Sequence, residues 1–366
     1  MKRLLCIMSN MNAGGAETFL MKIYREIDRT QYQMDFCVNV REKNYYEDEI
    51  NELGGRIYRI PSRTENYTIH NSELYSLIHN NDYKYVLAIS SSAASLIDLK
   101  IAKRAGAEVC SLRSSNSEGA GGKIRSIVYK LLRFSLMKYV NKKIAPSMPA
   151  AKYMFGEKAI RNREVIILPN GLNVKEYEYS MKERTKVRIA YGISDDTIVL
   201  GHIGRFNTQK NHMFLIDVFS SFHKKHEKSV LMLVGEGNLE SMIRKKIEEY
   251  HLENNVIFTG SQKNIGSYLS AMDAFVFPSL YEGMPNTIIE AQANGLTCFI
   301  SDTITKEANI TGNVNYLSIA NGCDMWVQEI EKAIGNKRMS QEDAFIKNHY
   351  TIQETSRQFV DIVYKE

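Results

Sequence analysis

Two glutamates, Glu282 and Glu290, are separated by seven residues and flank a turn that follows an apolar segment. The turn consists of Gly283, Met284, Pro285 and Asn286. Because proline is favoured at the first position of a helix, we expect a helix to start near this proline and its free N–H groups to bind an anion. A carboxylate can accept two hydrogen bonds from a vicinal diol. The segment therefore predicts a site for a diphosphate with a sugar hydroxyl pair at each end; the alternative is a solvated helix start with two surface glutamates.

Two cations occur in a polar loop of the same half of the chain. The loop follows a predicted strand that ends at Ile203, and it carries Arg205 and Lys210 ahead of the next predicted helix. An arginine fork and a lysine point charge can together neutralise a diphosphate. The charge that develops on a leaving nucleoside diphosphate could then be stabilised without a metal ion. The alternative is a pair of surface charges that flank a loop.

Two glycine-containing loops are weaker candidates. Gly14 and Gly15 lie between the first predicted strand and its helix, where glycine lets the backbone approach a ligand closely. Gly235 and Gly237 follow another predicted strand and resemble the start of a dinucleotide-binding fingerprint, but the rest of that fingerprint is missing. We expect both loops to line a ligand cleft, with Gly235 near the nucleobase. A purely structural turn is the alternative for the first loop.

The candidate loops can form one site only if the strands before them end near one another. The chain shows alternating strand and helix patterns. Such alternation is typical of a mostly parallel sheet covered by helices. In the first half, the predicted strands are 3–8, 34–40, 56–60, 85–89, 108–112 and 143–145, and the predicted helices include 16–27 and 124–139. In the second half, the predicted strands are 197–203, 230–234, 256–259, 274–278 and 297–301, and the predicted helices include 211–223 and 239–247.

The two similar halves indicate two domains. At 366 residues, the chain is longer than one hydrophobic core usually organises. We predict an α/β fold of two Rossmann-like domains that face a central cleft, because ligands of open α/β sheets bind at the carboxyl ends of the strands. The expected domains are 1–180 and 181–345, joined by a polar stretch at 173–188 that has no sheet pattern. Residues 346–366 are expected to form a C-terminal helix that could pack back on the first domain.

Composition narrows the class of protein. The chain is 44% hydrophobic and 24% charged, which is typical of a globular protein. Its apolar runs are too short to span a bilayer, and the apolar start is too short for a signal peptide, so we expect a cytoplasmic protein. The five cysteines are scattered and form no Cys-x-x-Cys pair, which favours reduced thiols.

Charge is unevenly distributed along the chain. Residues 1–185 carry 29 Lys and Arg against 20 Asp and Glu, which suits an acidic partner. The segment 123–143 holds seven of these cations and no acidic residue. We interpret it as a helix that packs on the sheet with solvated cations, and peripheral attraction to an anionic membrane would be an added role. Nucleic acid is not an expected partner, because no motif combines aromatic and basic residues for stacking.

Together these residues resemble the retaining glycosyltransferases of family 4, which have the GT-B fold. The resemblance covers nearly the whole chain and includes Gly14 with Gly15, residues 169–173, Arg205 with Lys210, the loop after Val234, and the block from Glu282 to Glu290. It implies that Arg205 and Lys210 hold the donor diphosphate and that Glu290 binds the ribose hydroxyls. Glu282 then contacts the transferred sugar, and the amides of 283–286 touch sugar and phosphate. It also implies that the acceptor hydroxyl attacks on the leaving group's face and gives its proton to the departing phosphate oxygen.

One departure from the family concerns the acceptor side. Many members have a histidine after a strand of the first domain, and the corresponding stretch here, 111–116, has none. It is similar to members with an Arg-Asn type motif. Arg113 and Asn116 are therefore the candidates for contacts with the acceptor or the donor phosphate.

Metal chemistry is not indicated by the sequence. No cluster of residues has metal-ligand spacing, and Asp195-Asp196 is interpreted as a solvated turn. We therefore expect transfer without a metal ion or another cofactor. His202 and His212 lie nearest to the motifs, and we interpret both as structural residues.

These observations predict a hexosyltransferase. It is expected to move a hexose or N-acetylhexosamine from a nucleotide-sugar, with UDP as the expected nucleotide, to a glycan or lipid-linked acceptor in surface polysaccharide synthesis, in the cytoplasm or at the inner face of the cell membrane. Two alternatives stay open, a nucleotide-sugar epimerase or hydrolase of the same architecture and a nucleotide-binding partner protein without catalysis. The candidate cations and acids argue against the second. A nicotinamide oxidoreductase is disfavoured, because the fingerprint and its acidic ribose ligand are missing.

Overall fold

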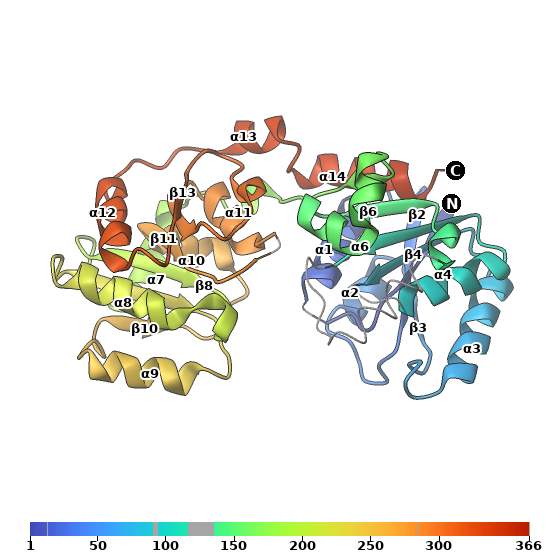
Figure 1. The fold of residues 1–366 in the computed structure, drawn as a ribbon, viewed down its shortest axis with the longest axis horizontal. Helices are drawn as coiled ribbons and strands as arrows, with labels where there is room; N and C mark the ends of the chain where they lie inside the picture. Colours follow the sequence, from blue (N-terminus) through green and yellow to red (C-terminus); the bar gives the residue numbers. More distant parts are fainter. Residues whose placement is uncertain (13, 91–93, 116–134, 283, 366) are drawn as a thin grey trace. The chain divides into compact units, whose positions relative to one another are not determined.

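The computed structural model describes residues 1–12, 14–90, 94–115, 135–282 and 284–365. It divides the chain into two compact α/β units, shown in Figure 1. The first unit comprises Met1–Gly171 and Ile352–Glu366, and the second comprises Leu172–Thr351. Each unit has its own sheet, as the alternating pattern predicts.

The first unit is built on a parallel sheet with the strand order β3-β2-β1-β4-β5-β6-β7. Its strands are β1 (Lys2–Ile7), β2 (Tyr32–Val38), β3 (Ile57–Arg59), β4 (Tyr85–Ser90), β5 (Val109–Ser114), β6 (Lys142–Ala145) and β7 (Val165–Ile167). The order of the strands reverses between β1 and β4. In open α/β sheets, ligands bind outside the carboxyl ends of the strands at such a reversal.

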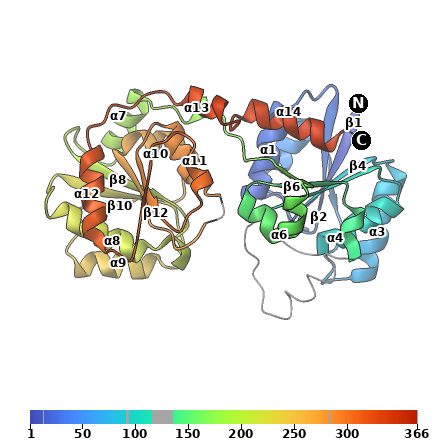
Figure 2. The same cartoon turned by 45° about the horizontal axis from the view of Figure 1, so that its top comes forward.

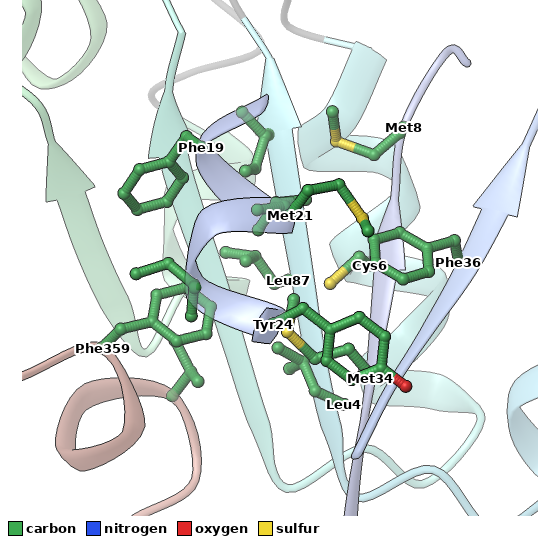
Figure 3. Close-up of a cluster of buried hydrophobic side chains, with 14 of the residues drawn as sticks. Leu4, Cys6, Met8, Phe19, Met21, Tyr24, Met34, Phe36, Leu87 and Phe359 are labelled. Atoms are coloured by element: carbon green, nitrogen blue, oxygen red, sulfur yellow. The ribbon is translucent and has the colours of Figure 1, made fainter. Parts of the chain in front are cut away.

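Helices cover both faces of this sheet. One face carries α1 (Gly15–Glu26), α2 (Glu47–Glu52) and α14 (Ile352–Val363), and the other carries α3 (Tyr67–Asn80), α4 (Ala94–Arg104) and α6 (Met148–Arg161). Figure 3 shows the apolar side chains beneath α1, with Phe19 near Phe359 of α14. Their ring centroids are 6.1 Å apart in an edge-to-face arrangement, which is favourable for aromatic pairs. The last helix therefore completes the core of the first unit.

The second unit repeats the design with the parallel strand order β10-β9-β8-β11-β12-β13. Its strands are β8 (Ile198–Ile203), β9 (Ser229–Val234), β10 (Val256–Phe258), β11 (Ala274–Phe277), β12 (Cys298–Ser301) and β13 (Val314–Leu317). The reversal lies between β8 and β11, which are hydrogen-bonded neighbours. Both strands are almost wholly buried, which is typical of central strands in a sheet covered on both faces.

The helices of the second unit form two groups, which Figure 2 shows on opposite sides of the sheet. One group consists of α8 (His212–His223), α9 (Glu240–Glu249) and α12 (Cys323–Ala333), and the other of α7 (Met181–Ala190), α10 (Ile265–Ala271) and α11 (Asn286–Ala293). The short helix α13 (Glu342–Lys347) and three 3-10 turns, η2 (Val174–Glu176), η3 (Thr208–Lys210) and η4 (Lys306–Ala308), complete the unit.

The unit boundaries differ from the expected ones. The second unit begins at Leu172 and ends at Thr351, whereas the sequence pattern placed its limits at 181 and 345. The polar stretch 173–188 is not a free connection, because it includes η2 and most of α7. Arg188 of α7 is 1% exposed and donates to Asp273 at 2.8 Å, so charge pairing attaches this polar helix to the unit.

Most predicted elements lie within two residues of the observed ones. The edge strands β7 and β13 were not predicted. The pattern did not reveal them because β7 has one half-buried and two exposed residues, and β13 alternates poorly. The predicted helix 124–139 lies mostly outside the described residues, and its last part forms the 3-10 turn η1 (Met137–Tyr139).

Candidate active site

Two loops meet at the strand reversal of the second unit. One follows β8 and the other follows β11, so both leave the carboxyl ends of neighbouring parallel strands. The backbone N–H of Leu280 donates to the carbonyl of Gln209 at 2.9 Å. The side-chain amide of Gln209 donates to the carbonyl of Tyr281 at 2.9 Å. These bonds join the loop with the predicted cations to the loop with the first predicted carboxylate.

Lys210 and Glu282 form an ion pair at this junction. The Lys210 Nζ donates to Glu282 Oε1 at 2.6 Å, and the two side chains are 15% and 9% exposed. The same Nζ lies 4.5 Å from the ring centroid of Phe277, at the end of β11. The ammonium and the carboxylate are thus largely removed from water. Because the effective dielectric constant is lower there, their charges interact more strongly than they would at the surface. An anionic ligand can compete with Glu282 for this ammonium group.

Arg205 belongs to the same loop but is exposed. Its guanidinium has no hydrogen-bond or ion-pair partner within the part of the chain that the structure describes. A planar fork without a partner can accept a phosphate group at little reorganisation cost. The loop therefore combines one paired cation and one exposed cation.

Two buried histidines flank the loop that carries Arg205 and Lys210. His202 of β8 and His212 at the start of α8 are 0% and 2% exposed, and their ring centroids are 4.7 Å apart. Burial lowers the pKa of His212 to about 4, and the nearby Lys210 cation adds to this effect. Burial also lowers the pKa of His202, so both rings are neutral at pH 7. The two rings are buried in the core of the second unit, close to Lys210.

The second predicted carboxylate, Glu290, lies on α11, which begins at Asn286, four positions after Glu282. The helix starts near Pro285 as predicted: Pro285 is the N-cap of α11 with φ −80° and ψ 106°, and the helix begins at Asn286. Met284 is half-buried against the apolar core, and Gly283 lies outside the described residues. Glu290 accepts a hydrogen bond of 3.2 Å from the hydroxyl of Tyr177.

The loop after β9 packs against the loop after β8. A Cβ on Gly235 would lie 2.2 Å from the carbonyl oxygen of Gly204, and a Cβ on Gly237 would lie 2.3 Å from that of Phe206. Gly235 also has φ +135°, which other residues rarely adopt. These glycines allow close backbone packing that shapes the cation loop, so their role in the described structure is to support the site.

This packing predicts a large loss of stability for Gly235→Ala. The new methyl group would collide with backbone at a position whose φ already disfavours it, and we expect the free energy of unfolding to fall by about 2–4 kcal/mol. Gly192→Ala is the matched control, because Gly192 has φ +66° but nothing within 4 Å of a Cβ. Its expected loss is about 1–2 kcal/mol. Urea unfolding followed by circular dichroism measures both, and equal losses would contradict the packing argument.

In the first unit, Gly14 and Gly15 form the start of α1 after β1. Gly14 is the N-cap in an extended conformation with φ −112°, and the helix begins at Gly15. Gly15 is exposed, and a Cβ there would meet nothing within 4 Å. A Cβ on Gly14, in contrast, would lie 2.3 Å from a carboxylate oxygen of Glu17, so the Glu17 side chain lies against the N-cap of α1.

Arg113, the acceptor-side candidate at the end of β5, is buried. It is 2% exposed, its guanidinium carbon lies 3.7 Å from the ring centroid of Phe19, and it donates to Asn170 Oδ1 at 2.6 Å. Burial lowers the pKa of Arg113 to about 9. The side chain therefore fastens residues 168–170 to α1 and β5 in this structure. Asn116, the other candidate, lies outside the described residues.

Comparison with known proteins decides the family. Residues 183–351 match the family model described as glycosyl transferases group 1. EpsF of Bacillus subtilis (strain 168), which is named as a glycosyltransferase, is 31% identical over 354 residues, covering 94% of this chain and 91% of EpsF. The chain belongs to the group 1 glycosyltransferases. The matched residues cover all of the second unit of this glycosyltransferase except its first eleven residues. They include Lys210 and Glu282, which form the ion pair.

The chain is also similar to a second named relative and to a solved structure. The Escherichia coli UDP-Gal:alpha-D-GlcNAc-diphosphoundecaprenol alpha-1,3-galactosyltransferase is 26% identical over 246 residues, which cover 66% of this glycosyltransferase and 61% of that protein. The crystal structure of Anabaena Alr3699/HepE in complex with UDP and glucose has a TM-score of 0.78 at 16% identity, with 100% of both chains covered. At this identity the likeness shows the fold, which is GT-B, with two Rossmann-like domains.

In the described ranges of this glycosyltransferase, no group of three or more His, Cys, Asp and Glu side chains is placed to hold a metal ion. No helix in these ranges is both long and apolar enough to cross a bilayer. Asp196 lies in an exposed turn, where the Lys228 ammonium at 2.5 Å helps to lower its pKa to about 2.

Proposed function

We propose that this glycosyltransferase is a retaining, metal-independent member of family 4 that moves a hexose or N-acetylhexosamine from a UDP-sugar to a glycan or lipid-linked acceptor in surface polysaccharide synthesis. The observation that carries the proposal is the Lys210–Glu282 pair at the strand reversal of the second unit, directly before α11. A cation and an anion side by side suit a donor whose leaving group is anionic and whose sugar becomes electron-poor.

The residues have distinct parts in the proposed reaction. Lys210 and Arg205 neutralise the negative charge that grows on the departing diphosphate, so that no metal ion is needed for this purpose. Glu282, released from Lys210 by the diphosphate, turns to the sugar and stabilises positive charge in an oxocarbenium-like transition state. Glu290 accepts hydrogen bonds from the ribose hydroxyls. The acceptor hydroxyl attacks from the leaving group's face, and its proton goes to the departing phosphate oxygen.

The substrate classes are supported by the named relatives. The Escherichia coli relative uses UDP-Gal and a diphosphoundecaprenol-linked acceptor, and Alr3699/HepE was crystallised with UDP and glucose. The excess of cations in residues 1–185 suits an acceptor whose lipid diphosphate lies at an anionic membrane face. We therefore propose peripheral membrane contact on the acceptor side and a location at the inner face of the membrane.

Transfer assays with a panel of UDP- and GDP-sugars test the function. The acceptors are undecaprenyl-diphosphate sugars in vesicles with and without anionic lipid. We expect transfer from one or two UDP-sugars with retained anomeric configuration, unchanged activity in EDTA, and faster transfer in anionic vesicles. Loss of activity in EDTA that magnesium restores would contradict metal independence. Epimerisation or hydrolysis of the donor without acceptor, in place of transfer, would favour the alternative enzyme classes.

A further inference from the structure

Both connections of the second unit to the first pack on α11. The chain enters the second unit at Leu172 and leaves it at Thr351, and these two residues form a parallel β-bridge. An apolar cluster joins the two connections to α11, and its buried members are Leu172, Val174, Ile289, Ala293, Ile310, Phe345 and Tyr350. The helix that carries Glu290 is therefore part of the structure that holds the connections.

Asn294, at the end of α11, fastens these segments by its side-chain amide. It is 1% exposed and donates to the backbone carbonyl of Tyr177 at 2.7 Å. Its oxygen accepts a hydrogen bond of 2.5 Å from Arg338, which precedes the returning connection. A buried amide with partners on both sides fixes the backbone near Tyr177, because breaking either bond would leave a buried polar group unpaired.

The side chain of Tyr177 then reaches Glu290. Its hydroxyl lies 3.2 Å from Glu290 Oε1, although the two residues are 113 positions apart in the chain. Burial raises the pKa of Tyr177, and the Glu290 charge raises it further, so the hydroxyl stays protonated and donates to the carboxylate. A carboxylate has about four acceptor sites, so a bond from Tyr177 is compatible with further bonds from ligand hydroxyls.

We propose that Tyr177 is a positioning residue that orients the Glu290 carboxylate toward the donor ribose. This inference rests on the proposed function, in which Glu290 binds the ribose diol. It places a determinant of donor affinity in the segment by which the chain enters the second unit at Leu172. A change in the backbone of this segment would then alter the direction of Glu290.

The test is a cycle that removes hydroxyl groups from the protein and from the ligand. Calorimetric Kd values are measured for UDP and for 2′,3′-dideoxyuridine diphosphate with wild type, Tyr177→Phe, Glu290→Gln and the double variant. We expect Tyr177→Phe to weaken UDP about three- to tenfold and to change the dideoxy ligand less than about twofold. In the Glu290→Gln background, Tyr177→Phe should add less than about a twofold change.

Tyr191→Phe is the matched control, since the Tyr191 hydroxyl contacts Tyr268 and no predicted site residue. It should bind both ligands as wild type does. Equal weakening of both ligands by Tyr177→Phe, or no weakening of either, would overturn the positioning role. If Glu290→Gln itself binds both ligands like wild type, the ribose role of Glu290 in the proposed function fails, and this outcome is separate from the first.

Discussion

Replacing Glu282 with glutamine is expected to lower the rate of sugar transfer by about 10²- to 10³-fold, the size seen when one charge-stabilising group is removed from an active site. The amide keeps the shape of the side chain but cannot stabilise positive charge on the sugar. UDP binding should be unchanged or tighter, because the variant no longer holds Lys210 in the 2.6 Å ion pair. Single-turnover transfer and UDP calorimetry measure the two effects.

Glu253→Gln is a suitable control for the Glu282 variant. Glu253 is an exposed glutamate of the same unit, and its replacement removes the same charge away from the site. It should leave both transfer and UDP binding unchanged. The assignment of Glu282 would be wrong if Glu282→Gln kept wild-type transfer, or if its only defect were weaker UDP binding.

Replacing Lys210 with methionine has the second large expected effect. UDP affinity should fall about 10²-fold, because the variant loses a phosphate-binding cation and leaves the Glu282 carboxylate unpaired next to the diphosphate. Transfer should fall at least as much, since charge on the leaving group is also no longer neutralised. Lys245→Met, a change of an exposed lysine on α9, should affect neither property.

The double variant Lys210→Met/Glu282→Gln separates the two contributions. If the unpaired carboxylate repels the diphosphate, removing it should restore UDP affinity by about tenfold relative to Lys210→Met alone. Transfer should stay at the level of the weaker single variant, because both groups act in one reaction step. Strictly additive effects on UDP binding would show that the pair does not face the diphosphate.

The meeting of Lys210 and Glu282 could be anticipated from sequence because it depends on strand order. Both residues follow apolar segments that become the neighbouring strands β8 and β11, and parallel strands bring their carboxyl ends to one edge of the sheet. The predicted site in the second unit therefore needed two correct strand assignments and the adjacency of these strands, but no side-chain detail.

Other features depend on packing between distant segments and left no pattern in the sequence. Tyr177 lies in a polar stretch that was interpreted as a connection, and only the folded unit brings it to Glu290. Arg113 was predicted to face a ligand, yet Phe19 and Asn170 enclose its guanidinium. The position of Gly235 near the nucleobase stays a prediction, and its close packing against the carbonyl of Gly204 was not anticipated.

A crystal structure with bound UDP shows directly whether Lys210 and Glu282 face the donor diphosphate. We expect a phosphate oxygen to lie within about 3 Å of Lys210 Nζ and to replace Glu282 Oε1 as its partner. The ribose hydroxyls should then lie within hydrogen-bond distance of Glu290. A complex in which the ion pair of Lys210 and Glu282 is intact and the diphosphate lies away from both residues would contradict their proposed role in donor binding.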